Sequence, residues 1–163
     1  MSVSLTSNGL VMPATQSASS NANTLDDYEE GTYQYTITGV TSGSCTPKAN
    51  YDYFSYCKVG RMCQVGGRFE TQDNSASGML LWSLPFASAN LTAESGSHAG
   101  AIFLYRTGTS DINNPTLMTS EGAATAFCYF NNTDTNTSVN FLQGSSVDTS
   151  FEGYLGIVYS TTW

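Results

Sequence analysis

Hydrophobic and polar residues alternate in several short runs along the chain, and the clearest run covers residues 62–71. Cys63, Val65 and Phe69 fall on one face of this run and polar side chains fall on the other, with the period of two that is typical of a half-buried strand. Gly60 lies in a Lys-Val-Gly-Arg segment immediately before it. We therefore expect a turn that leads into a central strand.

Other short runs, alternating or continuously apolar, predict further strands at residues 33–38, 79–83, 101–105, 124–130, 139–142 and 151–159. Residues 73–78 are rich in turn formers and are expected to close a hairpin between the central strand and the next one. Residues 41–47 are expected to end the first strand, and Asn113-Asn114-Pro115 to lie in a loop. No segment shows a helical period. The sequence therefore predicts an all-β fold, an antiparallel β-sandwich of the jelly-roll type.

The first 24 residues have a different composition. They carry no charged side chain and are rich in Ser, Asn and Ala, so they are expected to form an extended N-terminal arm, residues 1–24, before a β-sandwich head domain, residues 25–163. The apolar residues Leu10, Val11 and Met12 are expected to contact a neighbouring subunit. A flexible linker is the alternative for this segment.

Charge and composition exclude several classes of partner. Charged residues make up 11% of the chain, against roughly 25% in an average domain. Thirteen acidic and five basic residues give a net charge of −8, which would repel the phosphate backbone of a nucleic acid. The first residues include neither a basic side chain nor a continuous apolar run, so we expect no secretion signal and no membrane insertion.

The residues that usually carry chemistry are sparse. The four cysteines, Cys45, Cys57, Cys63 and Cys128, match no metal or redox spacing, and they are expected to be reduced, largely buried thiols. The single histidine, His98, lies in a Gly-Ser-rich stretch and is expected in a loop. No nucleophile elbow or phosphate-binding loop occurs. The sequence therefore predicts no metal, no cofactor and no catalytic residue.

Carboxylates are the one group that could support catalysis, because glycan cleavage needs an acid and a second carboxylate. We interpret the acidic stretch at residues 26–30 as a solvated turn. The alternative is a cation site, or ion pairs with Arg61, Arg68 or another subunit. Glu70 with Asp73 is a second possible pair, and the members of the acidic stretch are Asp26, Asp27, Glu29 and Glu30. Such clusters are ordinary on protein surfaces, and we do not predict an enzyme.

Aromatic residues fit a binding function better. The chain has ten Tyr, eight Phe and two Trp, and such rings can stack on sugars while hydroxyl and amide groups form hydrogen bonds. Most of them are expected in the core. Tyr51 and Tyr53 lie in a polar stretch before the central strand, and we predict that they bind a receptor.

Three short motifs occur in a fixed order: Leu25-Asp-Asp-Tyr-Glu-Glu-Gly-Thr32, Tyr56-Cys-Lys-Val-Gly-Arg61 and Leu84-Pro-Phe86. Over about residues 20–90, this order and spacing resemble a domain that recurs at the C-termini of tail-fibre and other structural proteins of tailed bacteriophages. Tyr33 stands where that family often has Trp.

The resemblance implies a virion structural protein, the tip of a tail fibre or head fibre that contacts a host-surface glycan or receptor. It also implies a homotrimer that binds other virion proteins and is assembled in the host cytoplasm. A capsid-decorating or cement protein without receptor binding, and a glycan depolymerase, are the alternatives.

Overall fold

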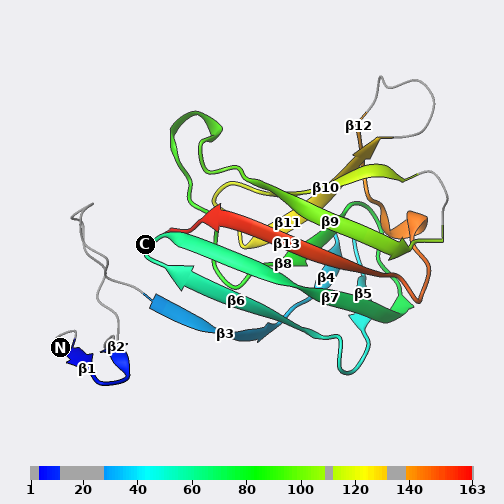
Figure 1. Cartoon of the computed structure of the whole chain (residues 1–163). Helices are drawn as coiled ribbons and strands as arrows, with labels where there is room; N and C mark the ends of the chain where they lie inside the picture. Colours follow the sequence, from blue (N-terminus) through cyan, green and yellow to red (C-terminus); the bar gives the residue numbers. More distant parts are fainter. Residues whose placement is uncertain (1–3, 12–27, 109–111, 132–138, 163) are drawn as a thin grey trace.

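The computed structural model describes residues 4–11, 28–108, 112–131 and 139–162 (Figure 1). The regular structure in these ranges is β-sheet, apart from two single-turn 3₁₀ helices, η1 and η2. The elements in chain order are β1 Ser4–Thr6, β2 Gly9–Val11, β3 Tyr28–Gln34, β4 Ile37–Gly39, β5 Ser44–Pro47, β6 Tyr53–Val59, β7 Met62–Asn74, β8 Leu80–Ser83, η1 Thr92–Glu94, β9 Ala99–Arg106, β10 Asn113–Thr119, β11 Thr125–Asn131, β12 Val139–Phe141, η2 Gly144–Ser146 and β13 Glu152–Ser160.

Eight of these strands close into an antiparallel barrel. The hydrogen-bonded order is β13-β9-β10-β11-β8-β4-β5-β7, and β7 pairs back onto β13. The closing pair is long, because every residue of β13, from Glu152 to Ser160, has a partner on β7. Strands β6 and β3 extend the sheet outward from β7, and β12 pairs with β11. In Figure 1, β13 crosses the front of the molecule between β9 and β7.

The all-β antiparallel class predicted from the sequence is confirmed, and so is the central strand. Strand β7 follows a turn in which Gly60 has a φ of 57°, a backbone conformation that glycine adopts without strain. Cys63, Val65 and Phe69 are buried on its inner face. The pairing defines a closed barrel with extra strands, and it does not by itself define a sandwich of two sheets.

Large aromatic side chains fill one part of the barrel interior. Phe69 on β7, Trp82 on β8 and Phe151 just before β13 are fully buried, and their ring centroids lie 4.9 to 6.2 Å apart. Burial of each such side chain contributes about 1.5–3 kcal/mol. This aromatic cluster packs β7, β8 and the start of β13 against one another inside the barrel.

The predicted strand at residues 33–38 is divided in two. Strand β3 ends at Gln34 and pairs with β6, whereas β4 begins at Ile37 and pairs with β8 and β5. Between them, Tyr35 is buried and its hydroxyl donates a hydrogen bond to the carbonyl of Tyr51. The chain therefore passes from the β3–β6 pair, outside the barrel, into the barrel strand β4. The alternation of apolar and polar residues continues across this point, so the sequence does not reveal the change of strand.

The predicted hairpin at residues 73–78 is wrong. Strands β7 and β8 are not neighbours, because β5 and β4 lie between them in the barrel. Further strands were missed. Residues 41–47 contain β5, the aromatic segment before the central strand forms the separate strand β6, Asn113–Pro115 begin β10, and β1 and β2 lie in the predicted arm. Strand β5 spans four residues and buries only Cys45, so it is too short to show a period.

Residues 4–11 of the predicted N-terminal arm form a small hairpin, with Leu5 opposite Leu10. Leu5, Leu10 and Val11 are exposed. Met12 lies outside the described residues, so the predicted subunit contact of Leu10, Val11 and Met12 stays a prediction.

Candidate binding site

Alternation along two strands brings aromatic side chains to the outer surface of the barrel. On β13, Leu155 and Ile157 are buried, and Tyr154 between Gly153 and Leu155 points outward. On β9, Ile102 is buried and its neighbour Phe103 is exposed, as is Tyr105 two residues further on. Both strands therefore present rings on the outer face, with period two.

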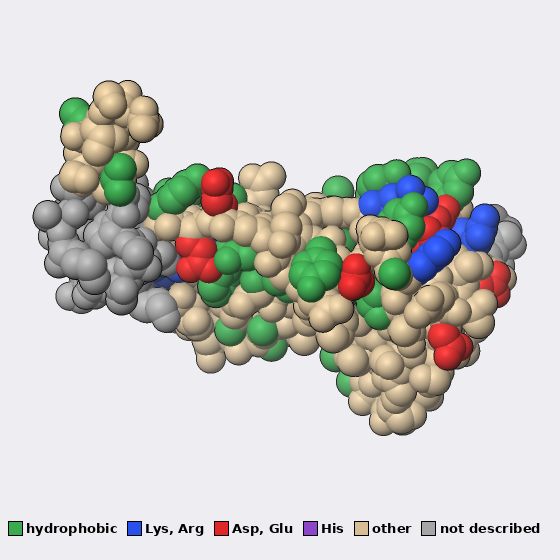
Figure 2. Space-filling model, turned by 90° about the horizontal axis from the view of Figure 1, so that it is seen from below, with side chains coloured by type: hydrophobic (Ala, Val, Ile, Leu, Met, Phe, Trp, Pro, Cys, Tyr) green, Lys and Arg blue, Asp and Glu red, His purple; other side chains and the backbone are tan. Residues whose placement is uncertain are grey.

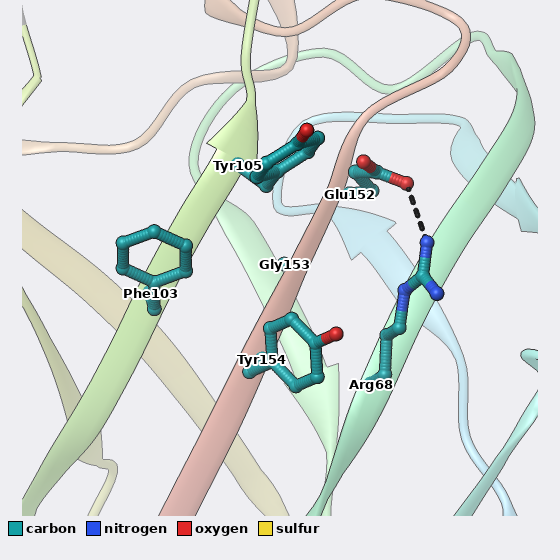
Figure 3. Close-up of a pocket in the computed structure, with 6 residues that line it drawn as sticks. All are labelled: Arg68, Phe103, Tyr105, Glu152, Gly153 and Tyr154. Carbon is teal, nitrogen blue, oxygen red and sulfur yellow. Dashed lines mark hydrogen bonds and ion pairs between the residues drawn. The ribbon is translucent and has the colours of Figure 1, made fainter.

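The strand register places these rings in a row with a cation. Tyr154 lies opposite Phe103 on β9 and opposite Arg68 on β7. Together with neighbouring side chains they line an open hollow of about 430 Å³ (Figure 3), whose lining residues are Arg68, Phe103, Tyr105, Glu152, Gly153 and Tyr154. Phe103, Tyr105 and Tyr154 are 61%, 68% and 51% exposed. Such rings offer flat apolar surface to a ligand.

A network of ion pairs forms the polar side of the hollow. The Arg68 Nη2 atom donates to Glu152 Oε2 at 3.1 Å and lies 3.9 Å from Glu70 Oε2. Glu70 also accepts a hydrogen bond from the Lys48 ammonium. Only 12% of the Glu70 side-chain surface and 9% of that of Glu152 are exposed. The two carboxylates are cross-strand partners, and like charges in that position repel each other. The contacts of Arg68 with both carboxylates offset this repulsion.

The electrostatics follow from this network. The hydrogen bond to Glu152 raises the pKa of the Arg68 guanidinium, and the hydrogen bond to Glu70 raises the pKa of the Lys48 ammonium. Both cations therefore stay charged in the folded protein. Three of the five basic residues, Lys48, Arg68 and Arg106, belong to this part of the surface, since Arg106 lies opposite Glu152 in the register. Figure 2 shows Lys and Arg side chains gathered at one end of the molecule, beside acidic and hydrophobic ones.

The predicted receptor residue Tyr51 reaches the edge of this site. The Arg68 guanidinium carbon lies 4.6 Å from the centroid of the Tyr51 ring and 5.9 Å from that of Tyr154, within the range of a cation–π contact. Tyr53 is exposed on β6, opposite Gln34 on β3, and does not line the hollow.

Sequence reasoning missed Phe103, Tyr105 and Tyr154. The run 101–105 is continuously apolar, so it predicts a strand buried on both faces. The only signal of an outer face was charge, because Arg106 and Glu152 lie at the ends of the two strands that carry the rings.

The described part of the acidic stretch lies in a strand and not in a turn, because Glu29 and Glu30 belong to β3. The hydroxyls of Tyr56 and Tyr28 donate hydrogen bonds to these two carboxylates, at 2.7 and 2.8 Å. Asp26 and Asp27 lie outside the described residues, so the cation alternative stays untested. In the described ranges no group of three or more His, Cys, Asp or Glu side chains could hold a metal ion.

Glu70 and Asp73, the second pair considered for catalysis, are not brought together as a pair. Glu70 contacts Lys48 and Arg68, whereas the Asp73 carboxylate accepts a hydrogen bond from the amide of Asn74. The carboxylate that faces Glu70 across the sheet is Glu152, which sequence spacing could not indicate.

All four cysteines are free thiols in the structure, three of them buried. Burial raises the pKa of Cys45 to about 11 and that of Cys128 to about 12. Cys57 and Cys63 lie on the neighbouring strands β6 and β7, where Cys57 is opposite Gln64 and Cys63 is opposite Lys58. His98 lies in the predicted loop, with Nδ1 2.8 Å from the carbonyl oxygen of Gly96.

A second hollow, of about 580 Å³, lies on the outer face of β10 and β11. Its lining contains amide, hydroxyl, thioether and aromatic groups but no charged side chain; the residues are Asn114, Thr116, Met118, Tyr129, Phe130 and Asn131. The first hollow offers the fuller set of recognition groups, and it is the candidate site.

Comparison with protein-family models and with curated proteins finds no match to this chain. Across the described part of the chain, no helix has the length and apolar character needed to cross a membrane.

Proposed function

We propose that this protein is a phage virion structural protein, the tip of a tail fibre or head fibre, and that it contacts a host-surface glycan through the hollow on β7, β9 and β13. The observation that carries the proposal is the row of exposed rings beside the Arg68–Glu152 ion pair. Rings stack on the apolar faces of sugars, and fixed charged groups form hydrogen bonds with their hydroxyls.

The position of the rings favours a ligand. Phe103 and Tyr154 are opposite each other on two paired barrel strands, and a patch of adjacent exposed apolar side chains is usually an interaction site. Side chains on paired strands are held more precisely than side chains on loops. A surface of this kind fits recognition of a ligand with a defined shape.

The proposal includes a homotrimer and a place in the virion, both implied by the resemblance to phage fibre domains. We further propose that the barrel is flattened into a jelly-roll-like sandwich, in which β9, β13 and β7 lie on one side of the core. Glycan binding without cleavage is also part of it, because Glu70 and Glu152 are both held in ion pairs. Such pairs suit binding better than proton transfer.

A capsid-decorating protein is the second candidate, and the N-terminal hairpin favours it. Leu5, Leu10 and Val11 are exposed there, and a neighbouring virion protein could cover them. In that case the hairpin would carry the function, and the hollow would bind nothing.

The test is adsorption of the purified, fluorescently labelled protein to a panel of bacterial strains and to polysaccharide extracted from their surfaces. We expect binding to particular strains, lost on Phe103→Ala with Tyr154→Ala. Val158→Ala is the matched control, since Val158 is exposed on the same strand outside the hollow. Binding that survives the double substitution would contradict a role of the hollow, and binding to no strain would favour capsid decoration.

A further inference from the structure

We propose that the hollow selects uncharged sugars, in glycans of more than one unit, and discriminates against sugars that carry carboxylate, sulfate or phosphate. This inference rests on the proposed glycan-binding function and names the chemical class of its ligand. It follows from how the charges of the hollow are already balanced.

The cation that lines the hollow is already compensated. Arg68 contacts two carboxylates, Glu152 at 3.1 Å and Glu70 at 3.9 Å. An anionic sugar that approached Arg68 would have to compete with Glu152 for the guanidinium and would meet two largely buried negative charges. Such an arrangement opposes anionic ligands, because juxtaposed like charges are a common device of specificity.

The surroundings reinforce this preference. Arg106, an exposed cation near the hollow, lies opposite the negatively charged Glu152 in the register, and its Nη1 is 3.5 Å from the Ser150 hydroxyl. The whole chain has a net charge of −8, so the long-range field also repels anions.

Neutral hydroxyl groups fit the same residues. A hydroxyl can donate to a carboxylate oxygen of Glu152 and accept from an N–H group of Arg68, without disturbing the ion pair. The guanidinium lies near the rings of Tyr51 and Tyr154, at 4.6 and 5.9 Å, so its orientation is fixed before a ligand arrives. Its donors therefore point in constant directions.

The rings extend over more than one position. Phe103 and Tyr154 face each other across β9 and β13, where Cβ atoms lie about 5 Å apart. Tyr105 is two residues further along β9, a step of roughly 6.6 Å. Stacking surface is thus available for consecutive units of an oligosaccharide.

The experiment uses the full chain and two matched sets of probes. The first set contains neutral oligosaccharides of glucose, galactose, mannose and N-acetylglucosamine, and the second contains oligosaccharides with uronic acid, sialic acid, sulfate or phosphate. Binding is screened on an array and then measured by calorimetry at about 0.1 M and about 1 M salt. We expect neutral ligands to bind at least tenfold more tightly, with affinity nearly independent of salt.

Two variants locate the effect in the hollow. Tyr154→Ala should weaken neutral-sugar binding about five- to tenfold, the loss expected for one stacking ring, while Val158→Ala leaves it unchanged. Glu152→Gln keeps the shape of the side chain and removes one negative charge, so it should reduce the discrimination against anionic sugars at least fivefold. Circular dichroism and thermal melting verify that each variant is folded.

The outcomes separate the two proposals. Tighter binding of an anionic probe, lost in Tyr154→Ala, would overturn the neutral-sugar inference and leave glycan binding by the hollow in place. Cell adsorption that is unaffected by Tyr154→Ala, together with no binding in either set of probes, would overturn both.

Discussion

The Nη2 atom of Arg68 lies 3.1 Å from the Oε2 atom of Glu152, although 84 residues separate them in the sequence. Arg68 belongs to β7 and Glu152 to β13, the two strands whose pairing closes the barrel. The candidate site is therefore a product of barrel closure. A chain in which β13 had not docked on β7 would still pair Tyr154 with Phe103, but it would lack the contact between Arg68 and Glu152.

Removal of the Arg68 guanidinium should destabilise the fold. In Arg68→Met, the carboxylates of Glu70 and Glu152 would face each other across the strands with one cation fewer. We expect a lower free energy of unfolding than in the wild type, with a smaller loss than for a fully buried ion pair, because the Arg68 side chain is partly exposed. Urea denaturation measures it.

The double variant Arg68→Met with Glu152→Gln is the control for this prediction. It leaves Glu70 with its Lys48 partner and removes the second negative charge, so about half of the lost stability should return. An Arg68→Met protein within about 0.5 kcal/mol of the wild type would show that the network contributes nothing measurable.

Two glycines of β13 should respond very differently to alanine. A Cβ atom at Gly153 would lie 2.4 Å from the carbonyl oxygen of Phe103 and 2.9 Å from the Phe69 ring, whereas a Cβ at Gly156 meets nothing within 4 Å. Gly153→Ala should therefore cost about 2–3 kcal/mol by overpacking. Gly156→Ala should be neutral or stabilise by about 0.5 kcal/mol, because alanine lowers the conformational entropy of the unfolded chain. Equal effects on the denaturation midpoint would refute the packing described at Gly153.

Stability should fall at alkaline pH, partly through Cys128. Burial raises the pKa of this thiol from 9.0 to about 12, so between these values the unfolded chain releases a proton that the folded protein keeps. The contribution of the protonated thiol to the free energy of unfolding is complete below about pH 9. Above that pH it decreases, by about 1.4 kcal/mol per pH unit for one group.

Cys128→Ala isolates this contribution from those of the other buried thiol and tyrosine groups. Urea denaturation at about pH 8 and about pH 10.5 should show a loss that is smaller in the variant than in the wild type by about 2 kcal/mol. The variant should be less stable than the wild type at pH 8, because it leaves a small cavity. Parallel losses in the two proteins would indicate that the thiol of Cys128 titrates normally.

The N-terminal hairpin should contribute to subunit association. Leu10 and Val11 are exposed in the single chain, and each would add about 1.5–3 kcal/mol if a neighbouring subunit covered it. Light scattering of the full chain should report a trimer that dissociates more readily in Leu10→Ser with Val11→Ser. Val40→Ser is the control, because Val40 is also exposed but lies outside the N-terminal hairpin, just after β4. A stable monomer at micromolar concentration, or a trimer unaffected by the hairpin substitutions, would identify the hairpin as a tether.

The sequence predicts well those strands that bury one face over many residues. Strand β7 alternates over Cys63, Val65 and Phe69, and its period is visible without a structure. Strands β4 and β5 span three and four residues, and each buries only one. Strands this short contain too few residues to show an alternating pattern, so the strand order that places both of them between β7 and β8 could not be predicted.

The site was predictable only in part, for a related reason. Tyr51 was singled out because it is an aromatic residue in a polar segment, and its ring contacts Arg68 at the edge of the hollow; its role in binding stays a prediction. Phe103 was assigned to the core because its neighbours Ile102 and Leu104 are also apolar, and only pairing shows which of them faces outward. The Arg68–Glu152 contact depends on the register of β7 and β13, which local sequence does not encode.

The double pairing of β7 and β13 has a consequence for dynamics. Each strand has hydrogen-bonded neighbours on both sides, β13 between β9 and β7, and β7 next to β13 and the strands β5 and β6. Their amide hydrogens should exchange with solvent only when the whole molecule opens, whereas those of the edge strand β3 exchange through local fraying. Tyr154 has partners on both β7 and β9, so it should lie in the most slowly exchanging part of the protein. A ligand would meet a preorganised surface, and its binding would lose little entropy to ordering of the protein.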